Sequence, residues 1–301
     1  MLILALAAAM LYGVADFLGG VASRRANPFA VMVVTEPAGA AVILLFALTG
    51  LTLARGSGLG AAAAFGAWGG MGWAVAGGAA GAVGLIAFYS GFAQAPMSVV
   101  APVSALVSTV LPVGIAVAGG ERLTAAVIAG ALACLAAIVL VSAHAEAEPG
   151  SGHPGRLRGL AYGVAAGAAF GLFFVFLKNA GHSAVLWPVA VSRVTGSLVA
   201  IVALVAVRAW QRRRTGSAAS GGGMSRQLLG IALVSGAVDA AANVCYILAT
   251  RAGQFGLAVV ITSLYPGATV LLARLVLRER MRALQQVGLV LAAVGIVLVT
   301  A

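Results

Sequence analysis

Long apolar runs separated by short polar connections make up almost the whole chain. A helix needs about 20 apolar residues to cross the hydrocarbon core of a bilayer, and its backbone groups must bond to one another because lipid offers them no partners. The pattern therefore predicts an all-α, multi-pass membrane protein with ten transmembrane helices. They are expected at residues 2–20, 29–53, 70–92, 97–118, 124–143, 157–178, 186–209, 227–249, 255–277 and 283–301.

Two of the connections are long, and the first divides the predicted spans into two groups of five. Residues 143–155 form an acidic stretch rich in Pro and Gly, and residues 208–226 carry three consecutive arginines followed by a Gly/Ser segment. Because five is an odd number, the second group must enter the membrane from the side opposite to the first.

The two halves also repeat one sequence pattern at an offset of 158 residues. Val99–Ala143 and Leu257–Ala301 each contain an apolar run, a charged turn and a second apolar run, and Glu121-Arg122 falls on Glu279-Arg280. Related halves of opposite topology form an inverted repeat about an axis in the membrane plane. We therefore predict two inverted five-helix repeats and a loop between them, at residues 1–143, 157–301 and 144–156 respectively.

The composition agrees with a membrane protein and argues against a nucleic-acid-binding one. Hydrophobic residues make up 62% of the chain and charged residues only 8%, whereas a soluble domain has about 25% charged residues. The net charge of +11 comes mainly from basic residues in the connections between the spans, where they set orientation and contact anionic lipid. The lipid bilayer is the expected partner, and the oligomeric state is left open because a single chain can be a complete transport unit. The Cys and His spacings do not suggest a metal site, and no cofactor is expected.

Four glycines lie on one face of the sixth predicted span: Gly159, Gly163, Gly167 and Gly171. Glycines spaced by four residues let helix backbones approach closely in a membrane. A single pair is explained by ordinary packing, whereas the run of four predicts one particular tight contact with another helix.

Ionisable residues within the spans are the first candidates for a site, because a charge at the bilayer centre costs about 2.5–3.5 kcal/mol. Asp239 lies near the middle of the eighth predicted span, and Asn243 and Tyr246 follow on the same helix face. Arg193, in the seventh span, can pair with Asp239. One interpretation is a structural ion pair that locks the two helices. The other is a binding site in which Arg193 holds a substrate carboxylate or keeps Asp239 ionised.

Asp16 and Glu36 flank the first connection, which carries Arg24 and Arg25. The favoured interpretation is a cluster at the membrane interface in which the two arginines offset the two acids. The alternative is that an acid here relays protons at the entrance of a transport path. Asp16, Glu36 and Asp239 are therefore the candidates for proton coupling.

Tyrosine hydroxyls within the spans could also face a cavity, although an aromatic residue there more often serves packing. The candidate substrate-binding residues are Arg193, Asp239, Asn243, Tyr246, Tyr265 and Tyr89.

Several motifs resemble the EamA-like branch of the drug/metabolite transporter superfamily. Gly120-Glu121-Arg122-Leu123 is similar to the Gly-Glu-Arg-Leu turn of that family, and Arg278-Glu279-Arg280-Met281 stands at the same place in the second half. Tyr12-Gly13 and Phe170-Gly171 fit the family's aromatic-Gly pair, and Ser263-Leu264-Tyr265-Pro266 fits its ninth helix. The resemblance covers the whole chain. It implies a carrier of small metabolites, often an exporter of amino acids or drugs, driven by a proton gradient or by exchange.

The basic residues and the resemblance disagree about orientation. Connections after odd-numbered spans carry thirteen arginines, and the other connections carry four basic residues. The positive-inside rule then places the odd connections in the cytoplasm and both termini outside, whereas the resemblance implies termini inside. Our expectation follows the charge count.

The sequence as a whole predicts a secondary transporter in the cell membrane, expected to export a small metabolite or drug-like solute by alternating access. No protease, hydrolase or phosphate-loop motif appears, so neither an enzyme nor an ATP-driven pump is expected. The alternative is a membrane protein that handles lipid-linked substrates or binds a partner without a solute cycle. A lateral apolar opening would favour this alternative, and a closed polar cavity would favour the carrier.

Overall fold

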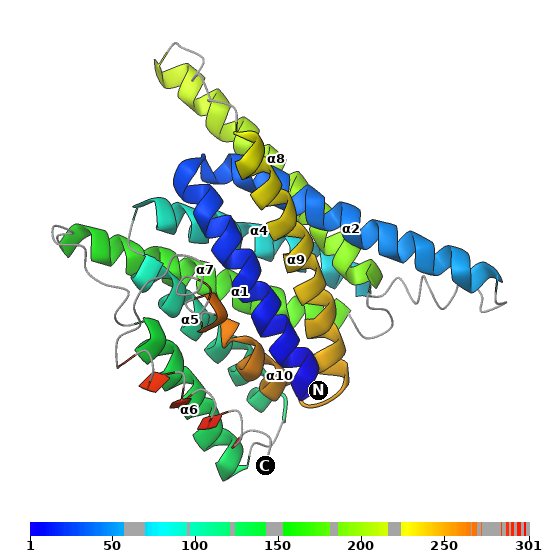
Figure 1. Ribbon diagram of the computed structural model, residues 1–301, viewed down its shortest axis with the longest axis vertical. Coiled ribbons are helices and arrows are strands. Elements are labelled where there is room, and N and C mark those ends of the chain that lie inside the picture. Colours follow the sequence, from blue (N-terminus) through cyan, green and yellow to red (C-terminus); the bar gives the residue numbers. More distant parts are fainter. Residues whose placement is uncertain are drawn as a thin grey trace.

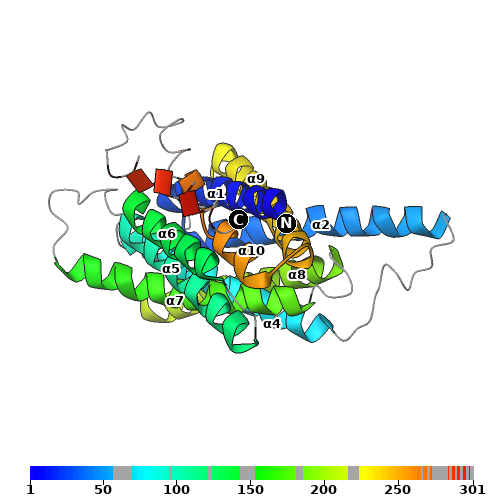
Figure 2. The same cartoon turned by 90° about the horizontal axis from the view of Figure 1, so that it is seen from below.

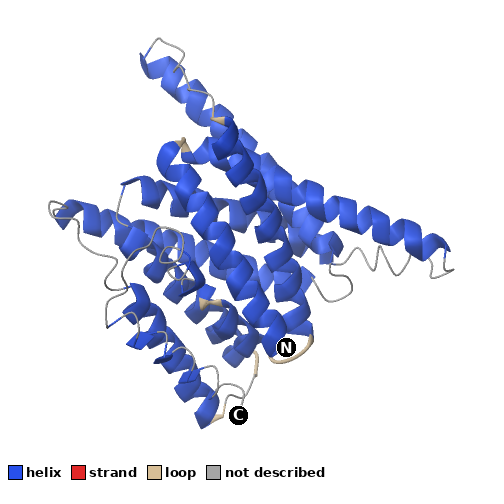
Figure 3. Ribbon diagram, viewed as in Figure 1, coloured by secondary structure: helices blue, strands red, loops and turns tan. Residues whose placement is uncertain are grey.

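Helices are the only regular secondary structure in the described part of the chain (Figure 3). The computed structural model describes residues 1–56, 70–94, 97–120, 124–142, 153–180, 186–215, 224–265, 267–269, 272, 284, 287–288, 290–291, 294–295 and 298. The helices are α1 (Leu2–Arg25), α2 (Pro28–Gly56), α4 (Met71–Gln94), α5 (Met97–Ala118), α6 (Ala125–Ser142), α7 (His153–Ala180), α8 (Leu186–Thr215), α9 (Arg226–Arg251) and α10 (Phe255–Thr262).

In the described part of the chain, six helices contain a segment long and apolar enough to cross a membrane, so the chain is a multi-pass membrane protein. The segments are Leu2–Arg25, Pro28–Phe46, Met71–Phe92, Leu157–Ala180, Leu186–Trp210 and Arg226–Arg251. Shorter apolar stretches lie in α5 and α6 and from α10 onward. The tenth predicted span, at residues 283–301, lies mostly outside the described residues, as do the charged turns Glu121-Arg122 and Glu279-Arg280.

The helices begin close to the predicted positions, but two of them end five or more residues later than predicted. α1 continues to Arg25 and α8 to Thr215, past the predicted ends at residues 20 and 209. Their last turns carry arginine side chains. Hydropathy falls where such residues begin, whereas the backbone hydrogen bonds of a helix continue into the interface.

The most extensive contacts join helices that are far apart in the sequence. α1 packs along α9, α4 along α7, and α5 also lies on α7 (Figure 1). α2 contacts both α8 and α9, and α4 contacts α8. α6 lies beside α5 at one edge of the molecule, while the C-terminal part of α2 extends beyond the other helices on the opposite side (Figure 2). The contacts of α1 with α9, of α2 with α8 and α9, of α4 with α7 and α8, and of α5 with α7 each pair a helix from residues 1–143 with one from residues 153–301.

The glycine face of α7 is the surface that packs on α5. A Cβ atom at Gly167 would lie 2.5 Å from the Ser104 carbonyl oxygen, and one at Gly163 would lie 2.8 Å from Cβ of Val103. Only glycine permits backbones to approach so closely. The predicted tight contact for this face is therefore confirmed, and α5 is the partner.

Large aliphatic and aromatic side chains cover the outside of the helices. Such exposure would be unusual for a soluble monomer, but these positions face acyl chains in a bilayer. Examples from α1, α2, α8 and α9 are Ile3, Leu45, Phe46, Leu198, Val202 and Val234. Several polar side chains lie in the interior instead, and they surround the cavity described next.

Candidate functional site

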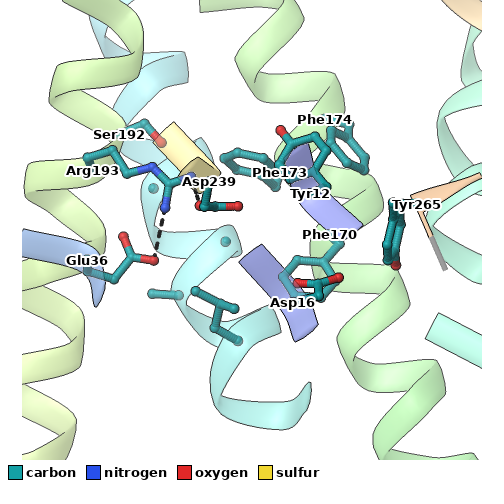
Figure 4. A pocket seen from close by; sticks show the side chains of 14 residues that line it. Tyr12, Asp16, Glu36, Phe170, Phe173, Phe174, Ser192, Arg193, Asp239 and Tyr265 are labelled. Carbon is teal, nitrogen blue, oxygen red and sulfur yellow. Dashed lines mark hydrogen bonds and ion pairs between the residues drawn. The ribbon is translucent and has the colours of Figure 1, made fainter. Parts of the chain in front are cut away.

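A cavity lies between helices from both halves of the chain (Figure 4). The space open to water-sized molecules is about 60 Å³. Seven of its lining residues come from the first half and seven from the second: Tyr12, Asp16, Glu36, Gly78, Gly81, Ala82 and Leu85, and Phe170, Phe173, Phe174, Ser192, Arg193, Asp239 and Tyr265.

Arg193 on α8 is held between two carboxylates on one side of this cavity. Its Nη1 donates to Oε1 of Glu36 at 3.2 Å, and its Nη2 pairs with Oδ2 of Asp239. Arg193 is 6% exposed and Glu36 is 4% exposed. Removing ions from water is costly unless each has a partner, so this arrangement is what membrane-embedded charges require. The predicted contact between Arg193 and Asp239 is present.

Glu36 does not belong to the interfacial cluster that we expected with Arg24 and Arg25. Both arginines are exposed at the end of α1, whereas the contact between α2 and α8 brings Glu36 to Arg193. The expectation was wrong for Glu36, because it rested on closeness in sequence, whereas helix packing decides which arginine is close in space.

Asp16 lines the cavity from α1. In the described part of the chain it has neither an ion-pair partner nor a hydrogen-bonded side chain. Figure 4 shows Asp16 apart from the dashed Glu36–Arg193 interaction. Among the three carboxylates of the cavity, Asp16 is therefore the one that has no counter-charge among the described residues.

Asn243 lies behind the cavity and joins α9 to α1. The Tyr12 hydroxyl donates to Oδ1 of Asn243 at 2.7 Å, and Nδ2 of Asn243 donates to the Asp239 backbone carbonyl at 2.7 Å. The Tyr12 ring then meets Phe174 edge-on, with the ring centroids 5.9 Å apart. Asn243 is thus placed to orient a wall of the cavity and does not line it.

The three tyrosines that we predicted have different places. Tyr265 lines the cavity. Tyr246 is fully buried and donates its hydroxyl to the Phe174 carbonyl at 3.2 Å, and the Tyr89 hydroxyl lies against Gly19. Neither Tyr246 nor Tyr89 is among the residues that line the cavity. Both belong to the packing behind the cavity wall.

Sequence reasoning did not single out Phe173, Phe174 or Gly81 as parts of the site. The offset of 158 residues could have found two of them, because it places Asp16 on Phe174 and Asp239 on Gly81. The counterparts of Asp16 and Asp239 thus line the same cavity.

A bundle of membrane-spanning helices with buried charges around an internal cavity defines a polytopic membrane protein with a polar site in its interior. The model of the EamA-like transporter family, a part of the drug/metabolite transporter superfamily, matches residues 157–301, so the second half of the chain belongs to this family of transporters.

A solved crystal structure is similar over 99% of this chain and 96% of that chain, with a TM-score of 0.70 and 20% identity. At this identity the likeness concerns the fold alone. The comparison with curated proteins gave no match.

Proposed function

We propose that the chain is a secondary transporter of the cell membrane that exports a small metabolite by alternating access, and that the cavity is its substrate site. The observation that carries this proposal is the lining of the cavity, which comes equally from the two halves and includes buried charges. A site built between two halves can open to either side when they move relative to each other.

The contacts between helices support the proposed inverted repeat. An offset of 158 residues places α1 on α7 and α4 on α9, so the packing of α1 on α9 corresponds to that of α7 on α4. In the same way, the contact of α2 with α9 corresponds to that of α8 with α4, and the contact of α5 with α7 to that of α10 with α1.

Individual glycine contacts follow the same relation. Gly78 lies against the Ser192 carbonyl oxygen, and Gly236, 158 residues later, lies against the Thr35 carbonyl oxygen. Gly13 faces Thr269, and Gly171 faces Leu111, which again lie 158 residues apart. Because the halves make matching contacts, two arrangements that exchange their roles can be close in free energy.

The carboxylates of the cavity are the residues that we propose for coupling solute transport to proton movement. Asp16, Glu36 and Asp239 lie within segments of membrane-spanning length, where an ionisable side chain is a default candidate for a proton path. We propose either proton coupling through these acids or exchange of one solute for another. The buried charges also favour a carrier over a protein that handles lipid-linked substrates, because acyl chains do not compensate ions.

Counterflow in proteoliposomes tests the transport function. The purified protein, loaded with an unlabelled metabolite mixture, should accumulate at least one labelled member of that mixture. Asp239→Asn should reduce the initial rate about tenfold or more, because it removes one partner of a buried arginine. Arg213→Gln, at an exposed position of α8, is the matched control and should keep the wild-type rate. Counterflow unaffected by Asp239→Asn would rule out the proposed site.

A further inference from the structure

We propose that the cavity binds a small organic cation, a protonated amine with a short apolar part, and that Asp16 is its ionic anchor. This inference rests on the proposed function, because it names the class of substrate for the same cavity.

The charges around the cavity favour a cation over an anion. Three carboxylates and one guanidinium line it, which gives a net charge of −2 when all four are ionised. The terminal nitrogens of Arg193 are already bound by Glu36 and Asp239. Both terminal nitrogens of Arg193 are therefore paired with protein carboxylates, although its Nε has no hydrogen-bond partner in the described part of the chain, whereas Asp16 lacks a counter-charge among the described residues.

The wall of the cavity offers aromatic rings to the same ligand. Phe170 and Phe173 of α7 line it together with Tyr265, as the close-up shows (Figure 4). An ammonium group close to a ring face gains electrostatic attraction, especially where water is excluded. A carboxylate at one place and rings around it are the groups that recognise an amine with an apolar body.

Two glycines of α4 hold these rings in place. A Cβ atom at Gly84 would lie 2.5 Å from the Phe170 ring, and one at Gly81 would lie 3.1 Å from the Phe173 ring. The rings therefore occupy space that larger residues on α4 would fill. The aromatic wall is fixed by backbone packing, which makes it a preformed part of the site.

The size of the cavity limits the ligand. With about 60 Å³ open to water-sized molecules, the cavity suits a small ligand. The n-butylammonium ion is a small probe of the proposed class, and its neutral and anionic counterparts are 1-butanol and butanoate. These three probes differ mainly in the charge of the head group.

Thermal unfolding of the purified full chain, in detergent at constant ionic strength, compares the three probes. Butylammonium chloride should raise the unfolding midpoint saturably by about 3 °C or more. 1-Butanol and sodium butanoate should not produce a saturable rise. An equal rise with butanoate or with 1-butanol, or no rise with butylammonium, would overturn the proposal.

Variants locate the effect. Asp16→Asn should weaken the apparent affinity for butylammonium about tenfold or more, because a buried charged partner is lost, and Phe170→Leu should weaken it severalfold. Glu148→Gln, in the predicted connection between the halves, removes the same charge elsewhere and should bind like the wild type. Wild-type affinity in Asp16→Asn refutes Asp16 as the anchor. If Asp16→Asn does not fold, Phe170→Leu decides, and wild-type affinity there refutes the aromatic site.

Binding and transport can fail separately in these experiments. Saturable binding of butylammonium that depends on Asp16, without counterflow of any solute, supports the cation site and refutes the carrier. Counterflow of neutral or anionic solutes, without binding of butylammonium, supports the carrier and refutes the cation site.

Discussion

Arg193 shares its two terminal nitrogens between one acid from each half of the chain, Glu36 and Asp239. The three side chains thus connect α2, α8 and α9 in the interior of the protein, where neither lipid nor bulk water stabilises their charges. Removal of Arg193 would leave both carboxylates without a counter-charge, whereas removal of either acid leaves Arg193 with one partner.

Replacement of Arg193 should therefore be more harmful than replacement of all three residues. We expect Arg193→Leu to lower the free energy of unfolding by about 3–5 kcal/mol, since two carboxylates lose their counter-charge. The triple variant Glu36→Gln/Arg193→Leu/Asp239→Asn should regain a large part of this loss. Unfolding in SDS titrations measures both, and a triple variant no more stable than Arg193→Leu would contradict the argument.

The hydrogen bond between Tyr12 and Asn243 gives a second prediction for single residues. Tyr12→Phe and Asn243→Ala should each destabilise the protein by about 1–3 kcal/mol, because each leaves a buried polar group without its partner. The double variant should cost less than the sum, with a coupling energy of about 1 kcal/mol. Additive effects in the same SDS titrations would show that the 2.7 Å contact contributes nothing.

At the residue scale, the sequence was enough to pair Arg193 with Asp239 but not with Glu36. Asp239 lies in the predicted span that follows that of Arg193, and both residues are rare charges in apolar runs. Glu36 is 157 residues away, and nothing in hydropathy indicates that α2 contacts α8. The sequence therefore favours Arg24 and Arg25, the arginines nearest along the chain, as partners of Glu36.

Glycines set the distances between the helices that carry the site. Gly78 and Gly236 each lie against a carbonyl oxygen of another helix, that of Ser192 on α8 and that of Thr35 on α2. A side chain at either position would push away a backbone segment next to Arg193 or Glu36.

Alanine at Gly78 or Gly236 should thus be destabilising by about 1–3 kcal/mol, because the neighbouring backbone must shift. Gly114 and Gly230 are matched controls, since a Cβ atom there meets nothing within 4 Å. Alanine at those two positions should be neutral or stabilise by up to about 1 kcal/mol through helix propensity. Equal effects in all four variants would show that the close approach is unimportant.

At the scale of helices, hydropathy was a sound guide to position, because lipid imposes both length and apolar character on a span. It was a poor guide to the ends of α1 and α8, which continue through arginine-bearing turns to Arg25 and Thr215. Hydropathy also could not show which helices pack against each other. The regular glycines of α7 predicted a tight contact with another helix, but they did not identify that helix.

The whole molecule is held together by contacts between the halves. α1 packs along α9, α4 along α7, and α2 against α8, whereas contacts within residues 1–143 are less extensive in the described part. The proposed repeats are therefore units of sequence that do not form separate cores. The prediction of two units rests on the 158-residue offset and on hydropathy, but the mutual packing depends on tertiary contacts that one sequence does not reveal.

Each half should consequently need the other to fold. Residues 1–152 and 153–301, produced together as two chains, should assemble into a complex that survives purification in mild detergent. Either half produced alone should be degraded or aggregate, because its apolar and charged contact surfaces lack partners. Recovery of a stable, monodisperse single half would contradict the interleaved packing. Size-exclusion chromatography with light scattering distinguishes these outcomes.

The Glu36–Arg193 ion pair bears on how such a chain could arise. Thr35 and Ser192, which contact matching glycines, lie 157 residues apart, and the same spacing sets Glu36 on Arg193. Two identical modules joined about the proposed axis would place equal charges against each other here, and they would repel. If the proposed repeat arose by duplication, the opposite charges at this crossing mean that the two copies have since diverged, and they favour pairing of each module with the other over pairing with a second copy of itself.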